Sequence, residues 1–169
     1  ADKTEQLRFN LPRQDREPFL CLADFVVPKS SGLEDFVGMF VVTAGEGVMD
    51  LANQFKAEGK YFESHAIAAI ALESAEGFAE LLHKRMRDMW GIKDDTRLTL
   101  PQLHDAQYHG KRFRFGYPAC PNLEDQAKLW ELLKPDSIGV KLTEEFMMEP
   151  EASVSALVFS HPQARYFNV

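Results

Sequence analysis

The chain has 169 residues and a formal net charge of −7, and its apolar fraction of 45% is high enough to exclude intrinsic disorder. This length indicates a single domain, and no apolar run approaches the roughly 18–20 residues of a membrane span. An acidic chain also lacks the surplus of Lys and Arg that broad nucleic-acid binding needs. The sequence therefore predicts no membrane and no nucleic-acid partner.

The chain's two cysteines, Cys21 and Cys120, lie far apart and form no CxxC pair. This pattern favours reduced thiols and a cytoplasmic setting over a disulfide framework. The five histidines show no HExxH or other zinc-ligand spacing. The sequence therefore predicts no metal site.

The N-terminal part is predicted to be extended. Residues 1–18 are polar and read as a lead-in segment that precedes the domain at 19–169. The apolar run 19–27 ends at Pro28 and predicts a buried strand, and a second strand is predicted at 36–43. A short turn at 28–32 separates them, so we expect these two strands to pair antiparallel.

Helical patterns occupy the middle of the chain. A short helix is predicted from Val48 to about Glu58, and a long one over about 61–90. A capping-box pattern at 99–102 predicts a third helix, and Asn122 is expected to cap a fourth that ends before Pro135. The long helix is expected to bury one apolar stripe, which comprises Ile67, Ile70, Ser74, Phe78, Leu81, Met86 and Met89.

The last third of the chain has the composition of strands. We expect strands at 140–142, 146–148, 154–159 and 165–169, with residues 160–164 as the loop of a hairpin between the last two. Strands, then helices, then strands indicate an α+β fold, with an antiparallel sheet flanked by helices, one of them long.

The segment 112–121, Arg-Phe-Arg-Phe-Gly-Tyr-Pro-Ala-Cys-Pro, carries the clearest functional signal. Its glycine and two prolines fix an irregular backbone whose polar groups can bond the edge of a flat heterocycle. An arginine beside such a loop can hold a carboxylate through two parallel hydrogen bonds. On the residues alone, a rigid turn with surface arginines remains the more common explanation. No Ser/His/Asp arrangement, phosphate-binding loop or GxGxxG is present, so no catalytic residue is predicted.

Together with Leu22-Ala-Asp-Phe25, Ser153-Val-Ser155, Ser160-His-Pro162 and Arg165-Tyr-Phe167, this segment resembles the activation domain of cobalamin-dependent methionine synthase. The resemblance extends from about Asn10 to Val169 and implies a bent antiparallel sheet that binds S-adenosylmethionine in a shallow groove. It implies a repair function, in which the domain presents that methyl donor to inactive cob(II)alamin. The resemblance further implies that the cobalamin belongs to a neighbouring module and that a flavodoxin-type protein supplies one electron. The parent enzyme transfers a methyl group from methyltetrahydrofolate to homocysteine.

The same resemblance implies roles for individual residues. Asp24 matches the family's acceptor for the methionyl amino group, and Arg112 matches the arginine that holds the carboxylate. Tyr117, Pro118 and Ala119 correspond to loop contacts with adenine and ribose, and Tyr166 and Phe167 to an aromatic pair in the groove. Glu76 matches an acid near the pocket. Three residues depart from the family pattern, namely Ala106, Arg114 and Phe167. Of these, Arg114 implies either a second carboxylate contact or crowding of the ligand.

Two other hypotheses are kept open. The chain could be an interaction or scaffold domain of this fold that has lost its ligand, which Arg114 and Ala106 would favour. A free-standing methyltransferase would need a glycine-rich loop after its first strand, which the sequence lacks. The N-terminal residues suggest a module cut from a longer polypeptide. Basic clusters at 83–87 and 111–114 predict a positive patch that could steer an acidic flavodoxin.

Overall fold

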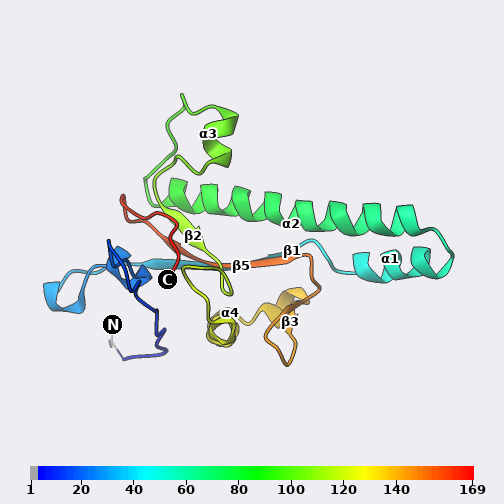
Figure 1. Cartoon of the computed structure of the whole chain (residues 1–169), viewed down its shortest axis with the longest axis horizontal. Coiled ribbons are helices and arrows are strands. Elements are labelled where there is room, and N and C mark those ends of the chain that lie inside the picture. Colours follow the sequence, from blue (N-terminus) through cyan, green and yellow to red (C-terminus); the bar gives the residue numbers. More distant parts are fainter. Residues whose placement is uncertain (1–3) are drawn as a thin grey trace.

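A computed structural model describes residues 4–169, so the first three residues of the predicted lead-in lie outside the described part. The centre of the fold is a three-stranded antiparallel sheet in the order β1-β5-β2 (Figure 1). Its strands are β1 (Val37–Thr43), β2 (Lys111–Phe113) and β5 (Ser153–Phe159). A second, two-stranded ladder pairs β3 (Lys141–Leu142) with β4 (Met148–Glu149).

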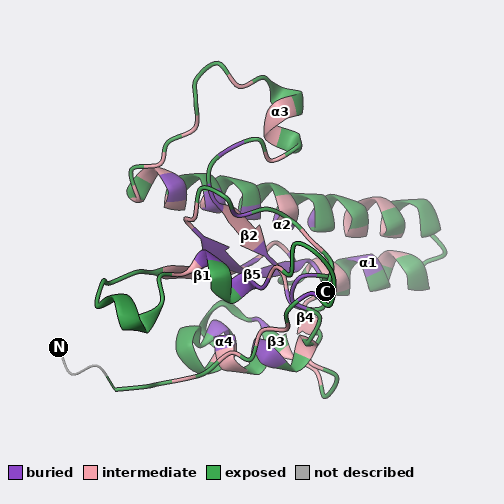
Figure 2. Ribbon diagram, turned by 60° about the vertical axis from the view of Figure 1, so that its left-hand side comes forward, coloured by how far each residue is buried: buried purple, intermediate pink, exposed green. Residues whose placement is uncertain are grey.

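All seven residues of β5 are buried, because both faces of the sheet are covered (Figure 2). Alternate side chains of a strand point to opposite faces, and two apolar cores follow from this alternation. Leu157 and Phe159 pack in one core with Leu129, whereas Val154, Ala156 and Val158 pack in the other.

The helices are α1 (Val48–Ala57), α2 (Tyr61–Met89), α3 (Leu100–His104) and α4 (Gln126–Leu133). Figure 1 shows α2 along one side of the sheet and α4 on the other, with α1 folded back against the start of α2. At Gly38 of β1 a Cβ atom would lie 2.9 Å from the Trp90 ring, so the glycine permits the close approach of β1 to the end of α2. The predicted α+β class, with an antiparallel sheet, flanking helices and one long helix, is confirmed.

The first predicted strand is wrong. Residues 19–27 contain a short 3-10 helix, Leu22–Phe25, in which Asp24 and Cys21 form a capping box. Because this segment forms no ladder, β1 pairs with β5, which lies more than a hundred residues later in the chain. The expected pairing between neighbouring segments is therefore wrong as well.

The C-terminal strand at 165–169 is also absent, and no hairpin follows β5. The second edge of the sheet is instead β2, a segment that the sequence presented only as a basic stretch. The strand expected at 146–148 is shifted, since β4 begins at its last residue.

The face of α2 that the sheet covers differs from the predicted apolar stripe. Its buried residues recur every fourth position and are Ala71, Ala75, Ala79, His83 and Arg87. Ile70, Phe78, Leu81 and Met89 of the predicted stripe are exposed. Small side chains allow the helix to lie close to the strands, so the face that carries the alanines becomes the inner one.

The segment before residue 19 packs against the domain. The Phe9 ring stacks on that of Phe115 at 6.2 Å between centroids. The buried Gln14 donates from Nε2 to the Asn168 carbonyl and accepts from the Leu20 amide, at 2.6 and 3.0 Å. None of the helices among the described residues combines the length and apolar character needed to cross a bilayer.

Candidate functional site

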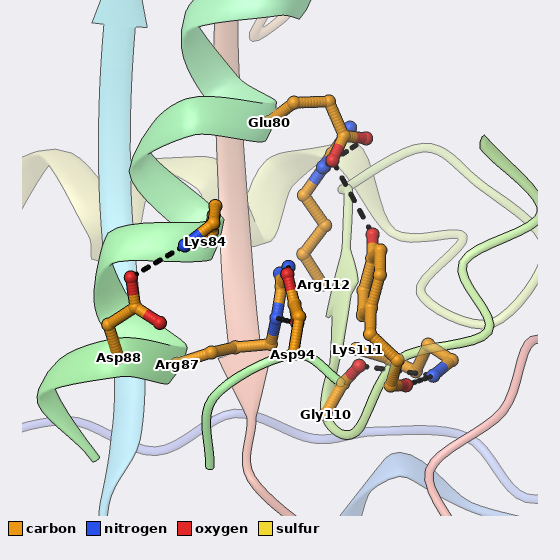
Figure 3. Close-up of polar contacts among 9 residues, drawn as sticks. Glu80, Lys84, Arg87, Asp88, Asp94, Gly110, Lys111 and Arg112 are labelled. Atoms are coloured by element: carbon orange, nitrogen blue, oxygen red, sulfur yellow. Dashed lines mark hydrogen bonds and ion pairs between the residues drawn. The ribbon is translucent and has the colours of Figure 1, made fainter. Parts of the chain in front are cut away.

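Two arginines of the β2 region face two glutamates of α2. Arg112 and Arg114 are two residues apart in an extended segment and therefore share a side, while Glu76 and Glu80 are one helical turn apart. Arg112 Nη1 lies 2.7 Å from Glu80 Oε1, and its Nη2 lies 3.9 Å from Glu76 Oε2. Figure 3 shows the Arg112 and Glu80 side chains end to end. The two elements thus hold a cation against an anion at the edge of the sheet.

The Arg112 side chain is only 11% exposed, yet the contact with Glu80 is an ion pair without hydrogen-bond alignment. Within the described residues, its buried Nη1 has no hydrogen-bond acceptor. A buried donor without an acceptor is costly, so this group suits a ligand oxygen. A carboxylate supplies such an oxygen.

The loop after β2 is a tight turn closed by its own backbone. The Gly116 amide donates to the Cys120 carbonyl at 2.9 Å, and the Cys120 amide donates to the Tyr117 carbonyl at 2.8 Å. Gly116 has φ +78°, a conformation that favours glycine. Over residues 4–169 no hydrogen bond uses the amides of Tyr117 or Ala119. These two donors are therefore free to bond a planar heterocycle.

Cys120, in the same loop, is buried, and burial raises the pKa of its thiol to about 12. A thiol with such a pKa stays protonated near neutral pH and is a poor nucleophile. Cys120 therefore contributes packing to the loop rather than chemistry.

The C-terminal segment supplies aromatic rings to the same region. The Tyr166 ring meets that of Phe113 edge-on at 5.4 Å, and the Phe167 ring meets that of Phe25 at 6.2 Å. The Val169 amide donates to the Pro118 carbonyl at 3.2 Å, which ties the end of the chain to the loop. The β2 strand with its following loop and the C-terminal segment, about fifty residues apart in the sequence, thus lie side by side.

A cavity of about 340 Å³ opens between β2, the loop and the C-terminal segment. Seven of the nine residues singled out from the sequence line it, and they are Arg112, Arg114, Tyr117, Pro118, Ala119, Tyr166 and Phe167. Phe113 and Asn168 complete the lining. The structure therefore brings most of the predicted residues together around one space.

Asp24 and Glu76 do not line this cavity. The Asp24 carboxylate accepts two hydrogen bonds from Arg13, both 2.6 Å long, and one from the Cys21 amide. The Arg13 guanidinium is the main reason why the pKa of Asp24 lies below its usual value. Asp24 therefore has a cationic partner from the N-terminal segment.

Glu76 is engaged by Arg114, whose Nη1 lies 2.5 Å from Glu76 Oε1. The Arg114 guanidinium also lies 4.9 Å from the centre of the Tyr117 ring, a cation-π distance. Arg114 thus links α2 to the loop at the side of the cavity.

The positive patch predicted from the basic clusters is reduced by ion pairs, which engage four of its six Lys and Arg side chains. Arg112 and Arg114 are paired with Glu76 and Glu80, Lys84 is paired with Asp88, and Arg87 is buried against Asp94. Burial and three nearby cations lower the pKa of His83 to about 3, so this side chain is neutral. Acids thus neutralise most of the charge that looks clustered in the sequence, Asp88 and Asp94 from nearby positions and Glu76 and Glu80 from a distant helix.

Glu80, Tyr108 and Asn168 are residues at or beside the site that the sequence reasoning missed. Glu80 could have been found as the residue one helical turn after Glu76. Tyr108 and Asn168 carry no such signal. Among residues 4–169 no group of three or more His, Cys, Asp or Glu side chains is placed to hold a metal ion.

Comparisons with known proteins agree with this architecture. The whole chain, residues 1–169, matches the family described as vitamin B12 dependent methionine synthase, activation domain, and the chain belongs to that family. Methionine synthase of Mycobacterium tuberculosis (strain ATCC 25618 / H37Rv) is 38% identical and that of Mycobacterium leprae (strain TN) 35%, each over 99% of this chain. The chain spans only 15% of the length of either relative.

A solved structure, the MetH reactivation domain bound to AdoHcy, superposes with a TM-score of 0.86. It is 42% identical in sequence, and the match covers 92% of this chain and 50% of that one. The family resemblance drawn from the loop sequence is therefore confirmed, as is the fold that it implied.

Proposed function

We propose that this chain binds S-adenosylmethionine in the cavity beside β2 and presents its methyl group for the reactivation of cobalamin in a methionine synthase. The observation that carries the proposal is the gathering of Arg112, the turn at 116–120 and the Tyr166–Phe167 pair around one cavity. Membership of the activation-domain family and similarity to a reactivation domain bound to AdoHcy support it.

In this proposal each part of the cavity recognises one part of the ligand. Arg112, which lines the cavity, binds the carboxylate. The amides of Tyr117 and Ala119 bond the adenine edge, and Pro118 shapes the turn. The rings of Tyr166 and Phe167 lie against the ribose and the sulfonium, which aromatic faces attract.

Asp24 and Glu76 are assigned to the ammonium group of the ligand. Because both carboxylates are paired with arginines, this assignment requires Arg13 or Arg114 to shift or to share its partner. Arg114 then either adds a second contact to the ligand carboxylate or returns to Glu76 when the cavity is empty.

The remaining components of the reaction would lie outside these residues. Bound S-adenosylmethionine supplies an electrophilic methyl group, and transfer to cob(II)alamin with one electron yields methylcobalamin and S-adenosylhomocysteine. We assign the cobalamin to a neighbouring module and the electron to a flavodoxin-type donor. The complete enzyme would transfer the methyl group of methyltetrahydrofolate to homocysteine. We place this function in residues 19–169 and in a cytoplasmic setting.

The alternative, a scaffold domain without a ligand, is not favoured. Such a domain would have no reason to retain a cavity with a largely buried guanidinium at its wall. A free-standing methyltransferase is not supported either, since the chain belongs to the activation-domain family.

The proposal is tested by isothermal titration with S-adenosylmethionine and S-adenosylhomocysteine. We expect saturable binding to the wild-type chain and a loss of at least about tenfold in affinity for Arg112→Ala, since a charge-assisted pair is worth more than 1.4 kcal/mol. Arg85→Ala, which removes an exposed arginine of α2, is the matched control and should bind normally. No measurable heat with the wild-type chain at millimolar ligand would refute the proposal.

A further inference from the structure

We propose that Glu80 is a positioning residue that holds the Arg112 guanidinium in the orientation that receives the ligand carboxylate. This inference rests on the proposed function, because it concerns the same cavity. Glu80 does not line that cavity and therefore acts through Arg112 rather than on the ligand.

The first argument is the geometry of the pair. Glu80 Oε1 lies 2.7 Å from Arg112 Nη1, the shorter of the two ion-pair contacts that this guanidinium makes with α2. The pair lacks hydrogen-bond alignment, so Glu80 attracts the guanidinium without occupying the donor. The cation is thereby held at the wall of the cavity that Arg112 lines.

The second argument is the competition around Arg112. Glu76 Oε2 lies 3.9 Å from Nη2 of the same arginine and is itself held by Arg114. Without Glu80, the Arg112 side chain would be drawn toward Glu76, away from the position that faces the cavity. A long arginine side chain also loses rotamer freedom when it is held, so holding it in advance lowers the cost of binding.

The third argument is that Glu80 is itself supported from the other side. The Tyr108 hydroxyl donates to Glu80 Oε2 in a long hydrogen bond of 3.5 Å, and the Tyr108 ring stacks on the Arg87 guanidinium at 3.7 Å. Arg87 in turn donates two hydrogen bonds to Asp94, 2.9 and 2.8 Å long. Figure 3 shows the Glu80, Arg87, Asp94 and Arg112 side chains between the end of α2 and β2. The Glu80 carboxylate thus has a defined position although it is 52% exposed.

The test compares S-adenosylhomocysteine with 5′-methylthioadenosine, which keeps the adenosine and the sulfur but lacks the amino-acid end. For Glu80→Ala we expect the dissociation constant of S-adenosylhomocysteine to rise at least about tenfold. That of 5′-methylthioadenosine should stay within about twofold, because it has no carboxylate for Arg112 to bind. Glu80→Gln keeps an oxygen beside Arg112 and should cost only about threefold.

A double-mutant cycle with Arg112→Ala separates an indirect role from a direct one. If Glu80 acts through Arg112, Glu80→Ala should have no further effect on S-adenosylhomocysteine binding in the Arg112→Ala background. A persisting effect would mean that Glu80 contacts the ligand directly, and the proposal would be overturned. Glu73→Ala, an exposed glutamate on the same helix, serves as the control.

Three other outcomes would also overturn the proposal. Equal losses for the two ligands would indicate general damage to the site, and an unchanged or tighter affinity for S-adenosylhomocysteine would show that Glu80 does not position Arg112. If the wild-type chain binds neither ligand, the proposed function fails together with this inference. Wild-type binding combined with equal losses refutes only the role of Glu80.

Discussion

At the scale of single residues, His83 is a titratable group held in a buried position. It is fully buried on α2, and neither ring nitrogen has a hydrogen-bond partner within residues 4–169. Burial, followed by the charges of Arg87, Arg112 and Lys111, lowers its pKa to about 3. The His83 imidazole is therefore uncharged and packs as an aromatic ring, and its protonation is unfavourable in the folded state.

This burial makes folding depend on pH. The folded pKa lies below the usual value of 6.5, so the unfolded chain takes up the proton first as the pH falls, and the stabilising contribution of neutral His83 is lost. We expect the free energy of unfolding to fall with a slope that steepens from about 0.7 kcal/mol per pH unit at pH 6.5 to about 1.3 at pH 5, a range where carboxylates contribute little. Urea titrations of His83→Leu should give a flatter profile. His65→Gln, at an exposed site, should keep the wild-type slope, and equal slopes in His83→Leu would contradict this assignment.

The Arg87–Asp94 pair is a second residue-scale feature that no local pattern predicted. The Arg87 side chain is 2% exposed and makes two hydrogen bonds to Asp94. Removing one partner of a buried pair leaves an uncompensated charge.

We expect Asp94→Asn to lower the free energy of unfolding by about 3 kcal/mol. Asp95→Asn, at the next position, breaks only an exposed pair with Arg97 and should cost less than about 1 kcal/mol. Chemical denaturation of the two variants provides the comparison. Similar losses in both would mean that Arg87 finds another partner or that Asp94 is more hydrated than the structure indicates.

At the scale of elements, α2 shows why the helix was predictable and its inner face was not. Its length follows from strong helix formers between Gly59 and Gly91. Its orientation, however, depends on the strands beneath it, which require small side chains for close approach. Counting large apolar residues therefore selected the outer face, because Phe78 and Leu81 outweigh alanines on any hydrophobicity scale.

Substitutions at two adjacent residues test which face of α2 is buried against the sheet. Ala79 is 0% exposed and packs with Phe40, Val42 and Val158, whereas Phe78 is 46% exposed. We expect Ala79→Leu to cost about 1–3 kcal/mol through overpacking. Phe78→Ala should cost less than about 1 kcal/mol, although it removes far more apolar surface. Thermal and urea unfolding of both variants measures these losses of stability. A larger loss for Phe78→Ala than for Ala79→Leu would support the buried stripe expected from the sequence.

The longer strands were predictable where apolar residues predominate. Residues 36–43 and 154–159 are mainly apolar, and both contain strands. Residues 19–27 have a similar composition, but Asp24 accepts the Cys21 amide and turns the chain into a 3-10 helix. The segment 111–113 carries two charges in three residues, and only its partner β5 makes it a strand.

At the scale of the whole molecule, the candidate site was found because the family resemblance named residues that the fold then brought together. Composition and spacing alone favoured a simple turn at 116–121. The partners of the arginines escaped prediction because Glu76 and Glu80 come from a helix more than thirty residues earlier. The net charge of −7 therefore says little about the local field, since most cations of the basic clusters are paired with acids, some of them from a distant helix.

The molecule also combines a well-packed centre with an exposed extension. Every residue of β5 is buried, and the buried positions of α2 begin at Ala71. Figures 1 and 2 show α1 and the first turns of α2 extending beyond the ends of the strands, and α1 buries only Ala52. The helical hairpin formed by α1 and residues 61–70 thus lacks the support that the sheet gives to the rest of α2.

We therefore expect this hairpin to open without global unfolding. In hydrogen-exchange mass spectrometry under native conditions, amides of α1 and of residues 61–70 should exchange at least about tenfold faster than those of β5, since regions with few buried contacts open at lower free energy. Amides of residues 75–87 belong to the same helix but lie on the sheet, and they provide the internal control. Equal protection in both halves of α2 would show that the hairpin unfolds only with the whole domain, and that contacts between α1 and α2 are sufficient to bind it to the core.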